Sequence, residues 1–574
     1  MPQWRLPERI DIAKGPNALL FGTSEPGGVA NFNTKRANFT DRTAVAFRVG
    51  SWDQYRATLD VNRQLSPNWA ARINLVEDSR KNWENWVGSE RGPSIWLSPT
   101  ASAKTPRCAP SKIPRSFRAA HNSPGQTRIR SPIFTHSAVL NLVRTNNPTT
   151  ANFNNANNTI RRRVYFAASD TAQNSALGVP ASDSTSGIAT AFMPTGGKTR
   201  LWSEATYEGI SAAGTYWEGL LRTSVGLRRD ENSNDIQSGA RNATSGLMDF
   251  TDPRRNVNQL KKYSPTVGGT LRPFGPITVF FNYAKTFRAP GTTGTNPLGE
   301  STTLRQGEGR EGGVRLELLE GRFYLTTSAY DITQTGQNHS VAAVATAING
   351  IWNDPILNSL NPTYADKVLT GGTSESQTLH ATGYEIELSA NLTPAWTLTA
   401  GYGNNINRVG ETDVGTLGYV HANLPEWERL AAANPLLAAS INAEIAAVHD
   451  YLLEAVPGLV RGRSYRDTVN LFTRYNFREG RLKGVTIGGG MSYRSPAALN
   501  SQMNSGVVTT LWGSIITEYE AMAAYSFRFS AKVRGRLQLN IRNLLDRRRY
   551  EEVNLSQTRY EAPRSLSLTT TLSF

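Results

Sequence analysis

The amino-acid sequence predicts an all-β fold, an antiparallel β-barrel that crosses a membrane with its strands. The clearest indication is the end of the chain, where apolar residues alternate with serine and threonine from residue 564 to Phe574. Because strand side chains alternate between two faces, Leu566, Leu568, Leu572 and Phe574 share one lipid-facing side. A closing strand that ends in an aromatic residue is typical of outer-membrane barrels, so Leu572 and Phe574 form the expected barrel-end signal.

The composition also favours a barrel. No run of about 18 apolar residues is present, so we expect no transmembrane helix. The mean hydropathy of −0.42 suits a barrel, because only every second strand residue faces lipid. The chain has 20 Tyr, 20 Phe and 12 Trp, and a barrel places many such residues at the membrane interfaces. The alternative is a large soluble all-β protein with aromatic cross-strand pairs.

Alternating segments occur in pairs that are separated by turn residues. We expect strands at 43–50, 54–65, 68–78, 263–272, 277–287, 312–319, 322–332, 384–391, 396–405, 468–477, 484–494, 518–530 and 536–542, and a final one from 564. Their connections are alternately short and long, as in barrels with short periplasmic turns and long outer loops. If Phe574 lies on the periplasmic side, the short turns fall on that side.

The longest predicted outer loop, 408–465, contains an Ala- and Leu-rich segment at 425–456. Its Glu-Trp-Glu start and the Pro457-Gly458 stop predict one or two helices, broken at Pro435. Two roles are open for this element: a lid without a specific role, or an element that contacts a ligand.

The formal net charge of +16 comes mostly from one stretch. No Asp or Glu lies between Arg91 and Ser169, whereas 12 Lys and Arg do, so the rest of the chain holds 50 basic and 46 acidic residues. One interpretation is a basic patch for nucleic acid or lipid phosphates. However, residues 91–132 show no helix or strand periodicity and hold seven prolines. We expect 91–132 to be irregular and outside the barrel wall, either as a disordered loop or as a frame-shifted patch.

No arrangement of residues predicts catalysis, a cofactor or a metal site. Cys108 is the only cysteine, and the histidines at 121, 136, 339, 380, 421 and 449 form no short ligand pair, although a site assembled in space stays open. Residues 307–312 match G-x-G-x-x-G, but a predicted strand follows instead of the helix that a dinucleotide site needs. The GGKT at 196–199 lacks the first glycine of a P-loop, because Phe192 occupies that position. We expect a protein that is not an enzyme.

The N-terminal segment carries the most specific motif. It reads ERIDIAKGPNALLFG at 8–22 and PGGVANFNTKR at 26–36, which predicts a strand, a Gly-Pro turn, a short apolar turn and a glycine-rich turn into a second strand. This pattern resembles the end of the plug domain of TonB-dependent outer-membrane receptors. The residues that carry the resemblance are Arg9, Lys14, Gly15, Pro16, Gly22, Gly27, Gly28, Asn31, Thr34 and Lys35.

The resemblance continues into the barrel. Segments 263–291, 310–333 and 381–402 resemble hairpins of the family, and 540–552 resembles the segment before the last strand, with Leu545 in place of the usual aromatic residue. The resemblance implies a transmembrane barrel of the 22-strand type, possibly incomplete, at 40–574. It also implies a plug remnant at 1–39, which we expect inside the lumen. Within the barrel, 91–200 is atypical and is expected to be irregular.

The resemblance implies an outer-membrane receptor for energised uptake of a scarce, bulky ligand: a ferric siderophore above all, or else cobalamin or a glycan. The implied partners are outer-membrane lipid, the TonB complex in the parent family and a ligand of unknown identity, but not nucleic acid. We recognise no signal peptide and no TonB box in this sequence, so we expect a truncated copy that does not transport by itself. The alternatives are a passive barrel or non-functional receptor fragment, and a basic nucleic-acid binder.

Overall fold

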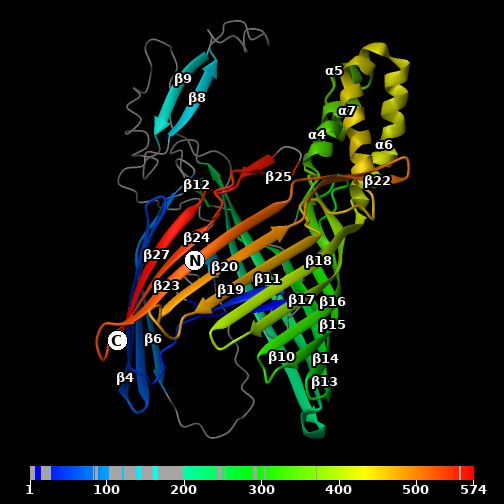
Figure 1. The fold of residues 1–574 in the computed structure, drawn as a ribbon. Helices are drawn as coiled ribbons and strands as arrows, with labels where there is room; N and C mark the ends of the chain where they lie inside the picture. The colour runs from blue at the N-terminus through cyan, green and yellow to red at the C-terminus, as the bar shows by residue number, and fades with distance from the viewer. Residues whose placement is uncertain are drawn as a thin grey trace.

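The computed structural model describes residues 7–14, 28–81, 83, 88–101, 119–121, 137–143, 159–165, 198–241, 248–250, 252–288, 294–302, 305–369, 371–554 and 557–574. Its main body is a closed antiparallel barrel (Figure 1). The last strand, β27 (Ser565–Ser573), pairs with β24 (Arg534–Arg542) on one side and with β3 (Arg42–Gly50) on the other. The predicted closure of the final strand against the strand at 43–50 is therefore confirmed.

The ring continues from β3 to β24 in sequence order. Its other strands are β4 (Gln54–Ser66), β5 (Trp69–Lys81), β6 (Gly88–Ala101), β7 (Ala119–His121), β10 (Lys198–Tyr216), β11 (Leu221–Arg241), β12 (Met248–Asp249), β13 (Arg255–Phe274), β14 (Ile277–Arg288), β15 (Arg305–Leu318), β16 (Phe323–Ser340), β17 (Ser374–Asn391), β18 (Trp396–Thr412), β19 (Asp467–Asn476), β20 (Val485–Arg494) and β23 (Ile516–Arg528). Every predicted strand pair is present, and several strands are longer than predicted. The full number of strands stays a prediction, because much of 102–197 lies outside the described residues.

In the described part of the chain, four two-stranded sheets lie outside the ring. They are formed by β1 (Pro7–Lys14) with β2 (Gly28–Thr34), β8 (Ser137–Val143) with β9 (Thr159–Tyr165), β21 (Ala498–Asn504) with β22 (Val507–Trp512), and β25 (Tyr550–Asn554) with β26 (Gln557–Tyr560). A short 3-10 turn, η3 (Trp217–Gly219), connects β10 to β11. The G-x-G-x-x-G segment at 307–312 lies within β15, so the strand that was predicted to follow this segment includes it.

The barrel wall has an apolar outer face and a polar or tightly packed inner face. In β14, Val279 and Phe281 are large and half-exposed, whereas Ala284, on the alternate face, is completely buried. In β3, Phe47 and Val49 are likewise exposed. Exposed apolar side chains at every second position are the pattern of a wall that faces lipid.

The two ends of the barrel differ in the length of their connections. We call the end that holds Phe574 the short-turn end and the opposite one the long-loop end. The turns β4–β5, β13–β14, β15–β16, β17–β18 and β23–β24 lie at the short-turn end, as predicted. One short connection departs from this rule: residues 51–53, between β3 and β4, lie at the long-loop end. There Trp52 and Asp53 adopt left-handed conformations, with φ of 59° and 51°, which suit a tight hairpin.

The expectation that 91–132 is irregular is wrong for its first part. Residues 91–101 belong to β6, which pairs with β5 in the barrel wall, and 119–121 form β7, which pairs with β10. Pro93 is tolerated because it falls in a register shift between Arg91 and Ser94, and proline is compatible with a bulge, where no ladder hydrogen bond is needed. Residues 102–118 and 122–132 lie outside the described part of the chain.

Helices gather at the long-loop end, above β16, β17 and β18 (Figure 1). One loop supplies α4 (Ala342–Trp352), α5 (Pro355–Leu360) and η4 (Pro362–Lys367); the next supplies α6 (Val414–Ala433) and α7 (Pro435–Glu454). We call these five elements the helical cap. They share one apolar core, in which the fully buried rings of Trp352 and Trp427 meet edge to face, with centroids 5.4 Å apart.

The prediction of two helices broken at Pro435 is confirmed, but the first helix begins at Val414 rather than near residue 425. Pro425 therefore lies inside α6, where it removes one backbone hydrogen bond. The buried residues Val420, Leu424 and Trp427 form a continuous stripe across this proline, so packing against the cap core outweighs the lost bond.

Helix α7 is long and apolar enough to cross a membrane by length and composition alone. It is nevertheless not a run of about 18 apolar residues, because Glu444 and Asp450 interrupt its apolar sequence. In the structure, its buried residues Leu437, Ile441 and Val448 belong to the core of the helical cap. One face of α7 therefore packs in the cap, while most of the helix lies outside that core.

Candidate functional site

The hairpin of β1 and β2 brings together the N-terminal motif residues that the structure describes. Arg9 forms an ion pair with Asp11 at 2.6 Å, and Asn31 donates a hydrogen bond to Asn33. Lys14 ends β1 opposite Gly28, whose φ of 130° favours glycine, and Thr34 ends β2 opposite Pro7. The predicted residues Gly15, Pro16, Gly22 and Gly27 lie outside the described residues.

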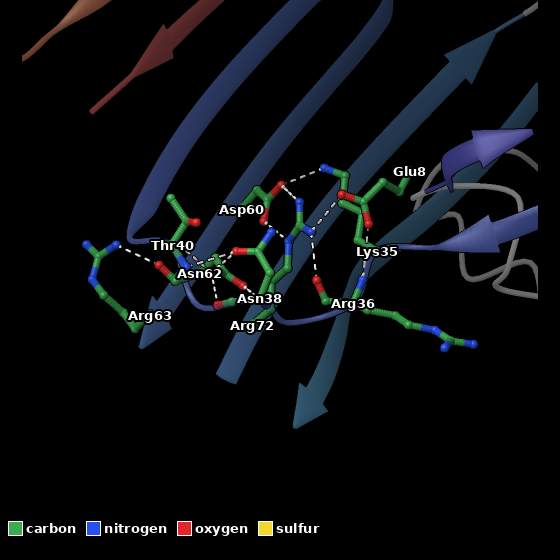
Figure 2. A network of polar contacts seen from close by, with 9 residues as sticks. All are labelled: Glu8, Lys35, Arg36, Asn38, Thr40, Asp60, Asn62, Arg63 and Arg72. Carbon is green, nitrogen blue, oxygen red and sulfur yellow. Dashed lines mark hydrogen bonds and ion pairs between the residues drawn. The ribbon is translucent and has the colours of Figure 1, made fainter. Parts of the chain in front are cut away.

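Lys35, the last motif residue, connects the hairpin to the barrel wall (Figure 2). Its Nζ lies 2.8 Å from Asp60 Oδ2 on β4. The same carboxylate receives two hydrogen bonds from Arg72 on β5, with Nε at 2.7 Å from Oδ1 and Nη2 at 2.7 Å from Oδ2. This is a bidentate pair in which both side chains are buried, so the attraction is little screened by water.

Arg72 also holds the two ends of the hairpin. Its Nη1 donates to the carbonyl oxygen of Arg36 at 2.9 Å and contacts Glu8 Oε1 at 3.2 Å. Glu8 begins the hairpin and Arg36 follows it, so one guanidinium group joins both chain segments to β5 (Figure 2). The expectation that this segment lies in the lumen is thus met at Glu8, Lys35 and Arg36, which contact the inner wall.

A second set of contacts fixes the linker after the hairpin. Asn62 Oδ1 accepts from the backbone N–H of Asn38 at 3.0 Å, and its Nδ2 donates to the carbonyl oxygens of Asn38 and Thr40. Asn62 is almost fully buried and satisfies the backbone of a segment that has no strand partner of its own. We call Glu8, Lys35, Asp60, Asn62 and Arg72 the luminal latch.

The luminal latch follows from the alternation of two strands. On β4, Tyr55 and Leu65 occupy exposed outward positions, so Asp60 and Asn62 face the lumen. On β5, Arg72 lies opposite Asn62 and is diagonal to Asp60, within reach of a long side chain. Sequence reasoning missed Asp60, Asn62 and Arg72. The available signal was a polar residue at every second position of two strands whose other face is apolar.

The helical cap is tied to the barrel by a polar base. His339, near the end of β16, lies with Nε2 2.7 Å from Oδ1 of Asp413, the residue before α6. Glu375, at the start of β17, accepts from the backbone N–H and the hydroxyl of Thr416 in α6, both at 2.9 Å. These buried contacts connect the cap to the ends of two barrel strands.

The described residues offer noncovalent binding chemistry. They contain no group of three or more His, Cys, Asp or Glu placed to hold a metal ion. His449 pairs with Glu428 on the neighbouring cap helix, and His380 contacts Thr333 on the adjacent strand. Cys108 and His136 lie outside the described residues. The side chains that face the lumen can therefore bind by hydrogen bonds and ion pairs.

Comparisons with known proteins agree with this architecture. Residues 8–544 match the family model described as TonB dependent receptor-like, beta-barrel. The metal-pseudopaline receptor CntO of Pseudomonas aeruginosa is 24% identical over 648 residues, covering 99% of this chain and 80% of that protein. The ferrioxamine receptor of Yersinia enterocolitica is 38% identical over 95 residues, which cover 16% of this chain and 13% of that protein.

Solved structures with a similar fold include two receptors. The ferric-catecholate import receptor Fiu of Escherichia coli K12 has a TM-score of 0.58 at 15% identity and covers 99% of this chain and 86% of its own. The ferripyoverdine receptor of the Pseudomonas aeruginosa outer membrane has a TM-score of 0.51 at 15% identity and covers 99% of this chain and 76% of its own. At this identity the two likenesses concern the fold.

Proposed function

We propose that this chain, which belongs to the TonB-dependent receptor β-barrel family, is the barrel and luminal hairpin of an outer-membrane receptor that takes up a bulky metal chelate of the ferric-siderophore class. The chelate binds at the long-loop end and passes through the lumen. Energy from the TonB complex displaces the luminal segment and opens the path. The role is transport without covalent chemistry.

The luminal latch is the observation that carries this proposal. A simple pore needs no segment held in its lumen, whereas a gated receptor needs one that is bound firmly yet reversibly. Lys35, Asp60 and Arg72 supply such a contact: charged groups in water-poor surroundings, joined by three short hydrogen bonds. When the hairpin moves out of the lumen, water can replace these hydrogen bonds. The free energy that this replacement costs depends on only a few residues.

The relatives narrow the ligand class. CntO is named as a receptor for a metal complex with pseudopaline, and the Yersinia protein as a receptor for ferrioxamine. Both names describe metal ions held by an organic chelator. A cobalamin or a glycan receives no comparable support, so we place ferric and related metal chelates first.

Binding tests this proposal directly. The full chain, refolded in detergent, is titrated with a panel of ferric siderophores, and quenching of tryptophan fluorescence by the bound iron is recorded. We expect saturable binding of at least one chelate, with no response to the iron-free buffer components. Failure of every metal chelate to bind a barrel that migrates as folded on an unheated gel would contradict the proposal.

A passive barrel is the competing function, and liposome swelling separates the two. A passive barrel admits small sugars at a rate that does not depend on the luminal latch. A gated receptor with the hairpin in place admits them slowly, and Asp60→Asn raises the rate. Equal and rapid swelling for both proteins would favour the passive barrel.

A further inference from the structure

We infer that Arg461, together with the side-chain amides of Asn405 and Asn407, forms a subsite at the mouth of the barrel for a carboxylate-bearing metal chelate. This inference rests on the proposed receptor function and specifies the ligand chemistry in the same lumen. The subsite lies where residues 459–461, which follow helix α7, pair with strand β18.

Arg461 reaches the lumen through its pairing with β18. Its backbone N–H donates to the carbonyl oxygen of Asn407 at 2.9 Å, next to the antiparallel bridge between Val460 and Arg408. Residues that lie opposite each other in an antiparallel pair point to the same face. Ile406 occupies an exposed outward position on β18, so its neighbours Asn405 and Asn407 face the lumen. Arg461 shares that luminal face.

A second cation lies close to Arg461. Arg305 begins β15 opposite Arg288 at the end of β14. Because Phe281 on β14 faces outward, Arg288 and Arg305 lie on the luminal face at the long-loop end. Burial, followed by the positive charge of Arg305, lowers the pKa of Arg461. A guanidinium group is therefore withdrawn from water beside a like charge, an arrangement that an anion stabilises.

Three other arginines of the barrel differ from Arg461 in having an acidic partner. Arg72 pairs with Asp60, Arg228 pairs with Asp230 at 2.8 Å, and Arg494 lies 3.5 Å from Glu551. The guanidinium group of Arg461, by contrast, has no acceptor among the described residues.

The two asparagines add unmet hydrogen-bonding capacity. The buried Oδ1 atoms of Asn405 and Asn407 have no donor in the described part of the chain. Buried polar groups in folded proteins are normally paired. Two unpaired acceptors and an unpaired cation on one face therefore indicate which groups a bound ligand would supply. Such a ligand carries an anion and hydrogen-bond donors.

The chemistry of these groups selects a carboxylate. The planar fork of arginine matches the two oxygens of a carboxylate, and such charge-assisted bonds are about twice as strong as neutral ones. The amide oxygens of the asparagines accept from the N–H or O–H groups of the same chelator. Lipid phosphates are excluded as the partner, because the subsite faces the lumen and not the outer wall.

The test compares two ferric complexes on the full chain: ferric citrate, which carries carboxylates, and ferrioxamine, which holds iron through hydroxamates. Tryptophan quenching gives the affinity of each. Arg461→Gln is expected to weaken ferric citrate binding about ten- to a hundredfold and to leave ferrioxamine binding within about twofold. Arg461→Lys keeps the positive charge but lacks the planar guanidinium group, so its affinity for ferric citrate is expected to lie between those of the native protein and Arg461→Gln. Arg429→Gln is the matched control, because this exposed arginine pairs with Glu426 on the cap.

Phenylglyoxal labelling of the unaltered protein provides a second measurement if the variants do not fold. Ferric citrate is expected to protect Arg461 from modification and to leave Arg429 reactive, as read by mass spectrometry. Ferrioxamine binding without ferric citrate binding, or ferric citrate binding that leaves Arg461 unprotected, would overturn the inference while the proposed function stands. Failure of both complexes and of the wider siderophore panel would instead count against the proposed function.

Discussion

Replacing Asp60 with asparagine should release the linker after the luminal hairpin. The substitution keeps the shape of the side chain but removes the charge that receives hydrogen bonds from both Arg72 and Lys35. The amide NH₂ of the asparagine then faces the guanidinium group of Arg72 or the ammonium group of Lys35. All three groups are hydrogen-bond donors, so no hydrogen bond forms between them. The buried Arg72 is left with the carbonyl oxygen of Arg36 and the more distant Glu8.

The structure allows the size of this effect to be worked out. Asp60 and Arg72 both belong to the barrel wall, so their pair persists when the linker opens, and only the bond between Asp60 and Lys35 is lost on opening. The side chains of Arg72 and Asp60 are 6% and 12% exposed, whereas Lys35 is 25% exposed and can turn toward water. A hydrogen bond between charged groups contributes about 1.5–3 kcal/mol, and the exposure of Lys35 favours the lower end, about 1.5 kcal/mol. At about 1.4 kcal/mol per tenfold, the opening equilibrium of the linker should rise about tenfold.

Hydrogen–deuterium exchange read by mass spectrometry measures this opening in residues 35–41. The backbone N–H of Asn38, bound to Asn62 in the native structure, is the principal reporter. Asp53→Asn is the matched control, because its pair with Lys81 is exposed and such pairs contribute about 0–1 kcal/mol. If 35–41 exchanges at the same rate in Asp60→Asn and Asp53→Asn, the luminal latch does not hold the hairpin and the reasoning is wrong.

Three further substitutions test the cap and the wall. Trp427→Ala removes a fully buried ring from the cap core and should destabilise the cap by about 3–5 kcal/mol, seen as protease cleavage within 413–459 while the barrel stays folded; a cap as resistant as the native one would show that the shared core is unimportant. Asn434→Ala removes the side chain that caps α7 at the N–H groups of Leu436 and Leu437, and should cost about 1 kcal/mol in cap stability measured by urea titration, with no loss expected for Asn434→Asp. Leu568→Arg places a charge on the outer face of β27 and should cost about 2–4 kcal/mol at mid-membrane depth, measured as reduced barrel assembly in lipid vesicles; unchanged assembly would mean that this face does not meet lipid.

The strands and the closure could be predicted because both depend on local alternation. Each hairpin combines a period of two with a turn signal. The alternation at residues 564–574 likewise identifies the closing strand, which pairs with the first strand of the barrel. Helices α6 and α7 were likewise visible as Ala- and Leu-rich sequence. The start of α6 was not, because the Glu-Trp-Glu run indicated a later start, whereas packing of Val420, Leu424 and Trp427 in the cap core extends the helix back across Pro425.

The luminal latch and the helical cap could not be predicted from local patterns. The alternation on β4 places Asp60 on the inner face, but its pairing with Arg72 depends on the register of two strands, and its pairing with Lys35 on where the hairpin lies. The cap core joins α4 and α7, which come from different loops. Strand β6 could not be predicted from its prolines alone, because only its register with β5 shows that Pro93 lies in a bulge.

The seam between β27 and β3 has a consequence for the order of folding. Arg48 Nε donates to Thr569 Oγ1 across 521 positions of the chain, and the neighbouring backbone bonds span similar separations. Contacts this distant in sequence form late, because the intervening chain must first be ordered and its loop entropy lost. Until the last nine residues arrive, β3 and β24 each present an unpaired strand edge that can capture another chain. Pairing of the C-terminal strand with β3 and β24 is therefore the step that converts an aggregation-prone sheet into a closed wall.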